Sequence, residues 1–310
     1  MRDLTAHQLN QRLGKGINFG NALDAAAGAL RLTEAYFDAV RAAGFDTVRL
    51  PVRWSGHAAE RAPYTIDGGF LDRVDWAVDG AMARGLNVVL NVHHYDELQA
   101  DPDGHAARFL GLWEQIAARY AARPDRLYLE LLNEPHGALV PRRWNALLAD
   151  ALAIVRDANP GRAVIVGTAR ANDIDALPDL RLPDDDRLIV TVHYYAPFEF
   201  THQGATWLPD TERWLGTSWG TGADRAAVVS DLDAAARWAA AHDRPLFVGE
   251  FGAYSKADPP SRLRWVEFVR TQAERRAMSW AHWDFATDFG VYDPERDAWR
   301  TPLLRALIDP

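Results

Sequence analysis

Short apolar runs alternate with longer amphipathic segments along most of the chain. Eight runs predict strands, over residues 16–20, 47–52, 86–93, 127–133, 163–167, 188–194, 245–251 and 278–284. Several of them, such as LNVVLNVH, LYLELLN and LIVTVHY, are almost continuously apolar. Continuous hydrophobicity of this kind is typical of parallel strands that are covered on both faces.

Between these runs, apolar residues recur at helical spacing. The pattern predicts helices over residues 33–43, 69–84, 105–122, 142–158, 225–241 and 259–276. In the third of these, Phe109, Trp113 and Ile116 fall on one helix face. Asp258 followed by Pro259 predicts an N-cap and the first helical residue after it.

Eight strands that alternate with helices within 310 residues predict an α/β fold, a single-domain (β/α)8 barrel over residues 1–310. A doubly wound open sheet is the alternative, but its dinucleotide-binding turn needs a G-x-G-x-x-G spacing that GINFGNALD lacks. The longest irregular stretch, residues 196–224, follows the sixth strand. In a barrel it would lie on the catalytic face.

Composition narrows the classes of function. The chain has 34 basic and 43 acidic residues, a net charge of −9, which argues against a nucleic-acid partner. No apolar run approaches the ~20 residues of a membrane span, and cysteine chemistry is excluded because there is no cysteine. The first residues lack the apolar stretch of a signal peptide, so we expect either an intracellular protein or a secreted one whose leader has been removed. The 12 tryptophans suit stacking on sugar rings, although they also suit packing of helices on strands.

Polar and aromatic side chains gather at the ends of the predicted strands, where barrel enzymes place their chemistry. They are Arg49, His93, His94, Tyr95, Asn133, Glu134, His193, Tyr195, Glu250, Trp283 and Asp284. A lone Glu or His at such a position is commonly structural, but their joint appearance at six strand ends predicts a functional site.

Two kinds of chemistry compete for this set. His93, His94, His193 and His282 could suggest a metal site, but GINFG offers no His-x-His. Adjacent residues of a regular strand also point to opposite faces, so His93 and His94 would not both face the centre. Glu134 and Glu250, after the fourth strand and on the seventh, instead supply the pair of carboxylates that glycoside hydrolysis needs. We therefore expect no metal and no cofactor.

Several motifs resemble one family in order along the chain. NEP after the fourth strand and GEFG on the seventh resemble clan A glycoside hydrolases. VRLPVRW, NVHHYD, HYYAPFEFTHQGATW and SWAHWDFATDFGVYD resemble glycoside hydrolase family five within that clan. The resemblance runs from about residue 13 to residue 308. It implies a retaining endo-β-1,4-glucanase of the cellulase type, without a separate carbohydrate-binding module.

The resemblance also implies roles for individual residues. Glu134 is the expected acid/base and Glu250 the expected nucleophile. The expected supporting residues are Arg49, His93, Asn133, His193 and Tyr195, and the expected substrate-binding residues are Asn21, Asp24, His94, His202, Trp207 and Trp283. Asp24 stands where relatives often have Glu, and AAAGAL after it lacks the tryptophan-containing acidic loop of those relatives.

Other functions with the same residues stay open. A β-mannanase, a xyloglucanase or an exo-acting β-glucosidase would use the same catalytic pair, and a non-catalytic barrel that binds carbohydrate would keep the aromatic residues. In each case the expected partner is a β-linked polysaccharide or oligosaccharide, with no nucleic acid and no membrane. We expect a monomer.

Overall fold

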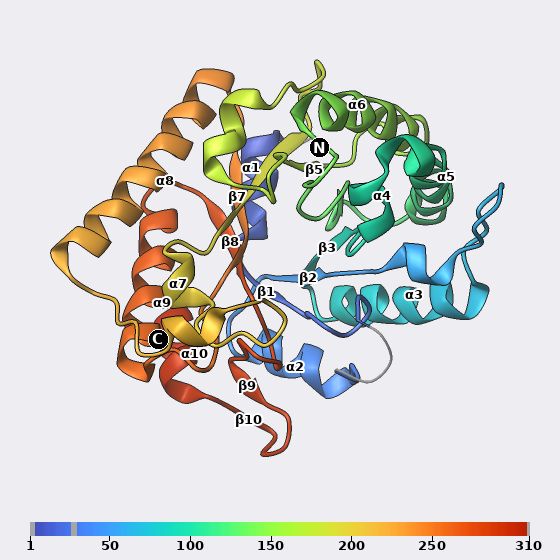
Figure 1. The fold of residues 1–310 in the computed structure, drawn as a ribbon. Coiled ribbons are helices and arrows are strands. Elements are labelled where there is room, and N and C mark those ends of the chain that lie inside the picture. The colour runs from blue at the N-terminus through green and yellow to red at the C-terminus, as the bar shows by residue number, and fades with distance from the viewer. Residues whose placement is uncertain (1–3, 26–29, 309–310) are drawn as a thin grey trace.

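The computed structural model describes residues 4–25 and 30–308, which form a closed barrel of eight parallel strands inside a ring of helices (Figure 1). Each strand pairs with the next along the chain, and β1 pairs with β8 to close the ring. The predicted (β/α)8 barrel is therefore confirmed.

All eight predicted strands are present, most of them shorter than predicted. They are β1 (Lys15–Asn18), β2 (Thr47–Leu50), β3 (Asn87–Asn91), β4 (Leu127–Glu130), β5 (Val164–Gly167), β6 (Leu188–Tyr194), β7 (Leu246–Phe251) and β8 (Ser279–His282). Only β6 has the predicted bounds. At the carboxyl ends the chain leaves the hydrogen-bonded ladder before the apolar pattern stops, so His93 and Glu134 lie beyond β3 and β4.

The six predicted helices are also present, within three residues at each end. They are α2 (Glu34–Ala42), α3 (Gly68–Ala83), α5 (Pro102–Tyr120), α6 (Pro141–Ala158), α8 (Gly222–His242) and α9 (Pro259–Glu274). The Asp258 side chain accepts a hydrogen bond from the backbone N–H of Ser261, which confirms the predicted N-cap.

Several short elements have no counterpart in the prediction. They are α1 (Ala6–Leu13), α4 (Asp96–Ala100), α7 (Phe198–Thr201), α10 (Thr301–Leu307), the hairpin of β9 (Tyr292–Asp293) and β10 (Ala298–Trp299), and the 3-10 turns at Trp54–His57, Ile174–Asp179 and Thr211–Trp214. The turn at Ile174–Asp179 replaces an α-helix between β5 and β6, so the alternation of strand and helix breaks there. No described helix is both long and apolar enough to cross a membrane.

The core has two layers, one between strands and helices and one inside the barrel. Inside, Val89, Tyr128, Ile165 and Phe247 pack against Leu13 of α1. α1 closes the amino-terminal end of the barrel, where the Tyr128 hydroxyl donates to the Leu9 carbonyl at 2.9 Å.

Nearer the carboxyl ends of the strands, the interior becomes polar. Asn18, Arg49, Asn91 and Glu130 are all fully buried there. A buried charge is costly unless it is paired, so we expect these polar side chains to bond to one another.

Candidate active site

Glu250, on β7, presents its carboxylate to a cavity at the carboxyl end of the barrel and is held from two sides. Arg49 Nη1 donates to Oε1 at 2.7 Å, and the Tyr195 hydroxyl donates to Oε2 at 2.9 Å. The Glu250 side chain is only 6% exposed. With both oxygens engaged, its rotation is fixed before any ligand arrives.

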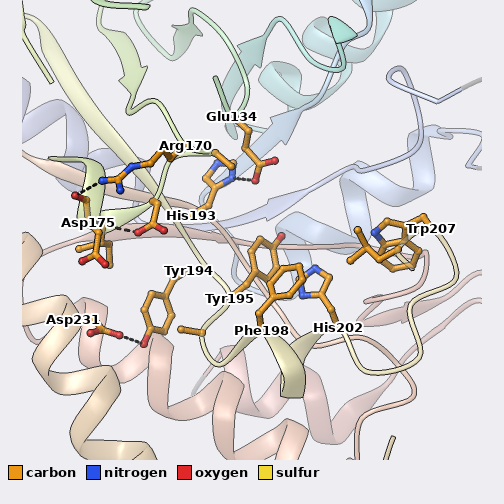
Figure 2. A pocket seen from close by; sticks show the side chains of 15 residues that line it. Glu134, Arg170, Asp175, His193, Tyr194, Tyr195, Phe198, His202, Trp207 and Asp231 are labelled. Carbon is orange, nitrogen blue, oxygen red and sulfur yellow. Dashed lines mark hydrogen bonds and ion pairs between the residues drawn. The ribbon is translucent and has the colours of Figure 1, made fainter. Parts of the chain in front are cut away.

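Glu134 lies in the turn after β4, with a left-handed backbone φ of 47°. Its Oε1 pairs with Nδ1 of His193, on β6, at 2.7 Å (Figure 2). The Glu134 side chain is 30% exposed, five times as much as that of Glu250. A carboxylate oxygen of Glu134, one of Glu250 and a ring nitrogen of His193 all lie within 4.8 Å of one another.

Arg49 connects this pair to the polar layer below. Its Nε and Nη2 form a bidentate ion pair with Glu130 at 2.7 and 2.6 Å, and Nη2 also donates to Asn133 Oδ1 at 2.8 Å. Nη1 donates to Asn18 Oδ1 at 2.9 Å as well as to Glu250. The fully buried guanidinium is therefore satisfied by two carboxylates and two amides.

Three neighbouring groups, Glu250, Glu134 and His193, shift one another's pKa. Burial raises the pKa of Glu250, against the opposing charges of His193 and Arg49. Burial also favours a neutral Glu134, but the hydrogen bond and charge of His193 outweigh it and lower the pKa of Glu134. Although burial lowers it, the charges of Glu250 and Glu134 raise the pKa of His193 overall.

Two other neighbours of the pair keep a fixed charge. Burial raises the pKa of the Tyr195 hydroxyl well above its usual value, so it stays a donor to Glu250. Burial lowers the pKa of His93 well below its usual value, so its ring stays neutral. Because both oxygens of Glu250 already accept hydrogen bonds, we place the mobile proton of the site on the His193–Glu134 pair.

Two cavities meet at Glu134. One, of about 430 Å³, is lined by Glu250, His93, Asn133, Trp283 and Asn21 among others. The second, of about 550 Å³, extends toward the loops after β5 and β6 and is lined by Arg170, Asp175 and Phe198 among others (Figure 2). Four residues line both cavities: Glu134, Tyr195, His202 and Trp207. The cleft therefore extends to both sides of Glu134.

Aromatic side chains form part of the cleft walls. The Trp283 ring lies parallel to the His93 ring, with centroids 5.8 Å apart. Trp207 is 50% exposed, which leaves a flat face open to the solvent side of the cleft. His202 stacks on Phe198 at 3.9 Å, and burial lowers its pKa to about 4.

The structure places Asp24 differently from the prediction that it binds substrate. Its side chain is fully buried and does not line either cavity, because it lies behind His94, whose Nε2 is 3.5 Å from Asp24 Oδ2. A longer Glu at this position would reach further. Tyr95 and Asp284, which also lie at the ends of predicted strands, are buried and line neither cavity, whereas the other predicted site residues lie at the cleft or, for Arg49, directly beneath it.

The metal hypothesis depended on four histidines that the structure does not bring together. His93 and His94 do lie side by side, with ring centroids 4.3 Å apart, because β3 ends at Asn91 and the alternation expected of a regular strand no longer applies. Together with Asp24 they form a group of side chains that could hold a cation. His193 is paired with Glu134 instead, and His282 is fully buried below the site.

Four polar residues of the network were not predicted from the sequence. Glu130 interrupts the apolar run LYLELLN, and a lone charge in a buried strand is a signal that could have revealed it. Asn18 and Asn91 likewise lie in predicted strands, where Asn91 Nδ2 is 3.1 Å from His93 Nδ1. Asn172 lies between two predicted strands, where its residue type alone gave no signal, although its amide contacts His193 at 3.2 Å.

This arrangement agrees with a match to a known family. Residues 14–288 match the family described as cellulase, glycosyl hydrolase family 5. The chain belongs to glycosyl hydrolase family 5. The resemblance found in the sequence motifs is therefore confirmed at the level of the family.

Several known proteins are similar over nearly the whole chain. It is 36% identical to endoglucanase H of Acetivibrio thermocellus over 98% of its length, and 29% identical to endoglucanase B of Clostridium cellulovorans over 99%. The chain spans 33% of the first relative and 76% of the second. The crystal structure of endoglucanase Cel5A from Thermotoga maritima is similar with a TM-score of 0.97 and 46% identity, covering 98% of this chain and 100% of that one.

Proposed function

We propose that this chain is an endo-acting β-1,4-glucanase that cleaves its substrate with retention of anomeric configuration. The observation that carries the proposal is the pair of carboxylates at the cleft, with an oxygen of Glu134 and one of Glu250 within 4.8 Å. Retaining glycosidases hold their carboxyl groups ~5–5.5 Å apart, whereas inverting ones need ~6.5–9.5 Å to admit a water.

The different partners of the two carboxylates support different roles. Glu250 attacks the anomeric carbon while Glu134 donates a proton to the departing glycosidic oxygen, so that a glycosyl ester forms as the C–O bond breaks. Once Glu250 is esterified, its negative charge is gone and Glu134 ionises more readily. Glu134 then takes a proton from a water that attacks the anomeric carbon and releases Glu250.

The neighbouring residues support each step. Arg49 and Tyr195 orient Glu250 for attack. Asn133, held by Arg49, lies where its amide can donate to the sugar 2-hydroxyl, an interaction that strengthens in the transition state. Trp283 offers a flat apolar face beneath the sugar that is cleaved.

The shape of the cleft supports endo action. Cavities of about 430 and 550 Å³ extend to either side of Glu134, so sugar units can bind on both sides of the scissile bond. An exo-acting β-glucosidase needs one side to be closed. Structures of Thermotoga maritima Cel5A are described in complex with cellobiose and with mannotriose, which supports β-1,4-glucan as substrate and β-mannan as a second one.

Product analysis on a panel of substrates tests the proposal. The panel contains carboxymethylcellulose, mixed-linkage β-glucan, glucomannan, mannan, xyloglucan and cellobiose. We expect rapid loss of viscosity and release of oligosaccharides from the glucans. Cleavage of mannan beside glucan would indicate a site that tolerates either configuration of the 2-hydroxyl.

Other outcomes would contradict specific parts of the proposal. Release of glucose alone from short substrates would indicate an exo-acting β-glucosidase, and binding without turnover would indicate a non-catalytic barrel. The stereochemistry of the first product, followed by proton NMR on cellotetraose, tests retention separately. Initial accumulation of the α-anomer would overturn the double displacement.

A further inference from the structure

The loop after β5 forms backbone hydrogen bonds on both sides of the His193–Glu134 pair. The backbone N–H of His193 donates to the Asn172 carbonyl at 2.9 Å, and the N–H of Ala171 donates to the Pro135 carbonyl at 3.0 Å. The first contact holds the loop against β6 at His193. The second holds it against the turn that carries Glu134.

This loop is built in an unusual backbone conformation. Arg170, Ala171 and Asn172 all have left-handed φ values, of 61°, 58° and 58°. Non-glycine residues visit this region at a cost, and three in succession persist only where the surroundings require them. In this conformation the side chain of Asn172 is fully buried and turned toward His193.

The amide of Asn172 faces the ring nitrogen of His193 that Glu134 does not use. Asn172 Nδ2 is 3.2 Å from His193 Nε2, while His193 Nδ1 is 2.7 Å from Glu134 Oε1. An amide N–H₂ group can only donate, so Nε2 must accept and the ring proton must be on Nδ1. Asn172 Oδ1 points away, toward Gly167, and has no hydrogen-bond partner.

From this geometry we infer that Asn172 is a positioning residue that holds His193 as a donor from Nδ1, so that the catalytic proton of Glu134 is carried by Oε2. The inference rests on the proposed function, because it assigns that proton to one oxygen. If Oε1 always accepts from His193, then the acidic hydrogen must be on the other oxygen and can be delivered to the leaving group.

The charged groups around His193 would otherwise favour a doubly protonated ring. Glu134 and Glu250 both raise its pKa, while Arg49 opposes them and His93 is the other titratable neighbour. The N–H₂ group of Asn172 disfavours a proton on Nε2, because two donors would then face each other. A carboxylate at position 172 would do the opposite.

Asn172→Asp tests this inference with almost no change in side-chain volume. The new carboxylate accepts from Nε2 and stabilises the imidazolium, so the shared proton moves from Glu134 to His193. The added negative charge also makes the pair hold this proton more tightly, so we expect the alkaline limb of kcat/KM to move up by about 1 pH unit. We also expect about a tenfold loss of kcat on cellotetraose and a much smaller loss on 2,4-dinitrophenyl cellobioside, whose leaving group needs no acid.

A second variant reaches Asn172 without replacing it. A Cβ on Gly167 would lie 1.9 Å from Asn172 Oδ1, so Gly167→Ala must displace the amide. We expect the same selective loss on cellotetraose. Asn159→Asp is the matched control, because Asn159 is also a buried asparagine but bonds to Arg162 and Ala117 away from the cleft.

Nitrogen NMR of histidine-labelled protein gives a readout that does not depend on turnover. We expect His193 of the wild type to be protonated on Nδ1 only, and the imidazolium of Asn172→Asp to persist to higher pH. A wild-type ring protonated on Nε2 only would overturn the inference. So would folded Asn172→Asp and Gly167→Ala proteins that keep the wild-type pH profile and leaving-group dependence.

The two proposals fail in distinguishable ways. A wild type that is inactive on both substrates, with His193 protonated on Nδ1, would refute the proposed function and support the positioning role. An active wild type whose Asn172→Asp and Gly167→Ala variants keep its pH profile and leaving-group dependence would refute the positioning role alone.

Discussion

Arg49 donates a 2.7 Å hydrogen bond to Glu250 while the same guanidinium forms a bidentate ion pair with Glu130 on the opposite side. Glu250 therefore shares its counter-ion with a second buried carboxylate. This sharing limits how strongly Arg49 can stabilise the ionised form of Glu250, and it agrees with a pKa of Glu250 that burial keeps raised. A nucleophile held in place but only partly neutralised retains its reactivity.

Glu250→Gln should abolish hydrolysis with little effect on folding. The amide keeps the shape of the side chain but cannot form the glycosyl ester, so we expect kcat to fall by about 10⁴-fold or more. Kinetics on mixed-linkage β-glucan measure the loss, and calorimetric titration with cellotetraose checks that binding remains. A variant with near-normal turnover would show that another residue is the nucleophile.

Glu134→Ala should affect substrates according to their leaving groups. Loss of the acid should lower the rate of cellotetraose hydrolysis by about 10²–10⁴-fold. Formation of the glycosyl enzyme from 2,4-dinitrophenyl cellobioside should be far less affected. Pre-steady-state bursts of dinitrophenol on that substrate would reveal the slow second step. Equal losses in the first step for both substrates would contradict the role of Glu134 as acid.

Arg49→Ala should destabilise the fold as well as the site. Removal of one partner leaves Glu130 as an uncompensated buried charge, which typically costs about 3–5 kcal/mol. Denaturant unfolding measures this difference. Arg84→Ala is the control, because Arg84 also pairs with two carboxylates, Glu34 and Asp38, but at the surface, where we expect a loss within about 1 kcal/mol.

Asp284 should make the folded protein less stable as the pH rises. Burial raises its pKa to about 7, above the value of 3.8 for an unperturbed carboxyl, so the folded state holds the proton more tightly than the unfolded chain. Its contribution to the free energy of unfolding is present below about pH 4 and is lost as the pH rises to about 7.

Asp284→Asn mimics the protonated carboxyl and removes this titration. Relative to the variant, the wild type should lose at most about 4 kcal/mol between pH 4 and 7. Urea unfolding across this range provides the measurement, with Asp186→Asn, at a highly exposed carboxylate, as the control. Parallel pH profiles for wild type and Asp284→Asn would show that Asp284 is already ionised in the folded state.

The barrel and most of the site could be predicted because their signals are local. Continuous apolar runs marked the strands, and NEP and GEFG marked Glu134 and Glu250 at their ends. The network below the site was harder to find. Glu130 and Asn91 lie in buried strands, and nothing in the sequence shows which partner each meets across the barrel.

Two further differences have a definite physical origin. The left-handed residue His94 follows a strand that has already ended, so the rule of alternating faces failed for His93 and His94. Asp24 was expected at the substrate but lies buried behind His94. In both cases the course of a loop, rather than the residue type, decided the position.

By itself, the sequence determined the fold class, the family and the two carboxylates, because hydrophobic period and short motifs depend on neighbours along the chain. Only the tertiary structure decided which groups share the proton of the site. The separation of Glu134 from Glu250, the division of Arg49 between two carboxylates and the contact of Asn172 with His193 all join segments far apart in sequence. Burial in the closed barrel then turns these distances into pKa shifts, since charges interact strongly where water is excluded.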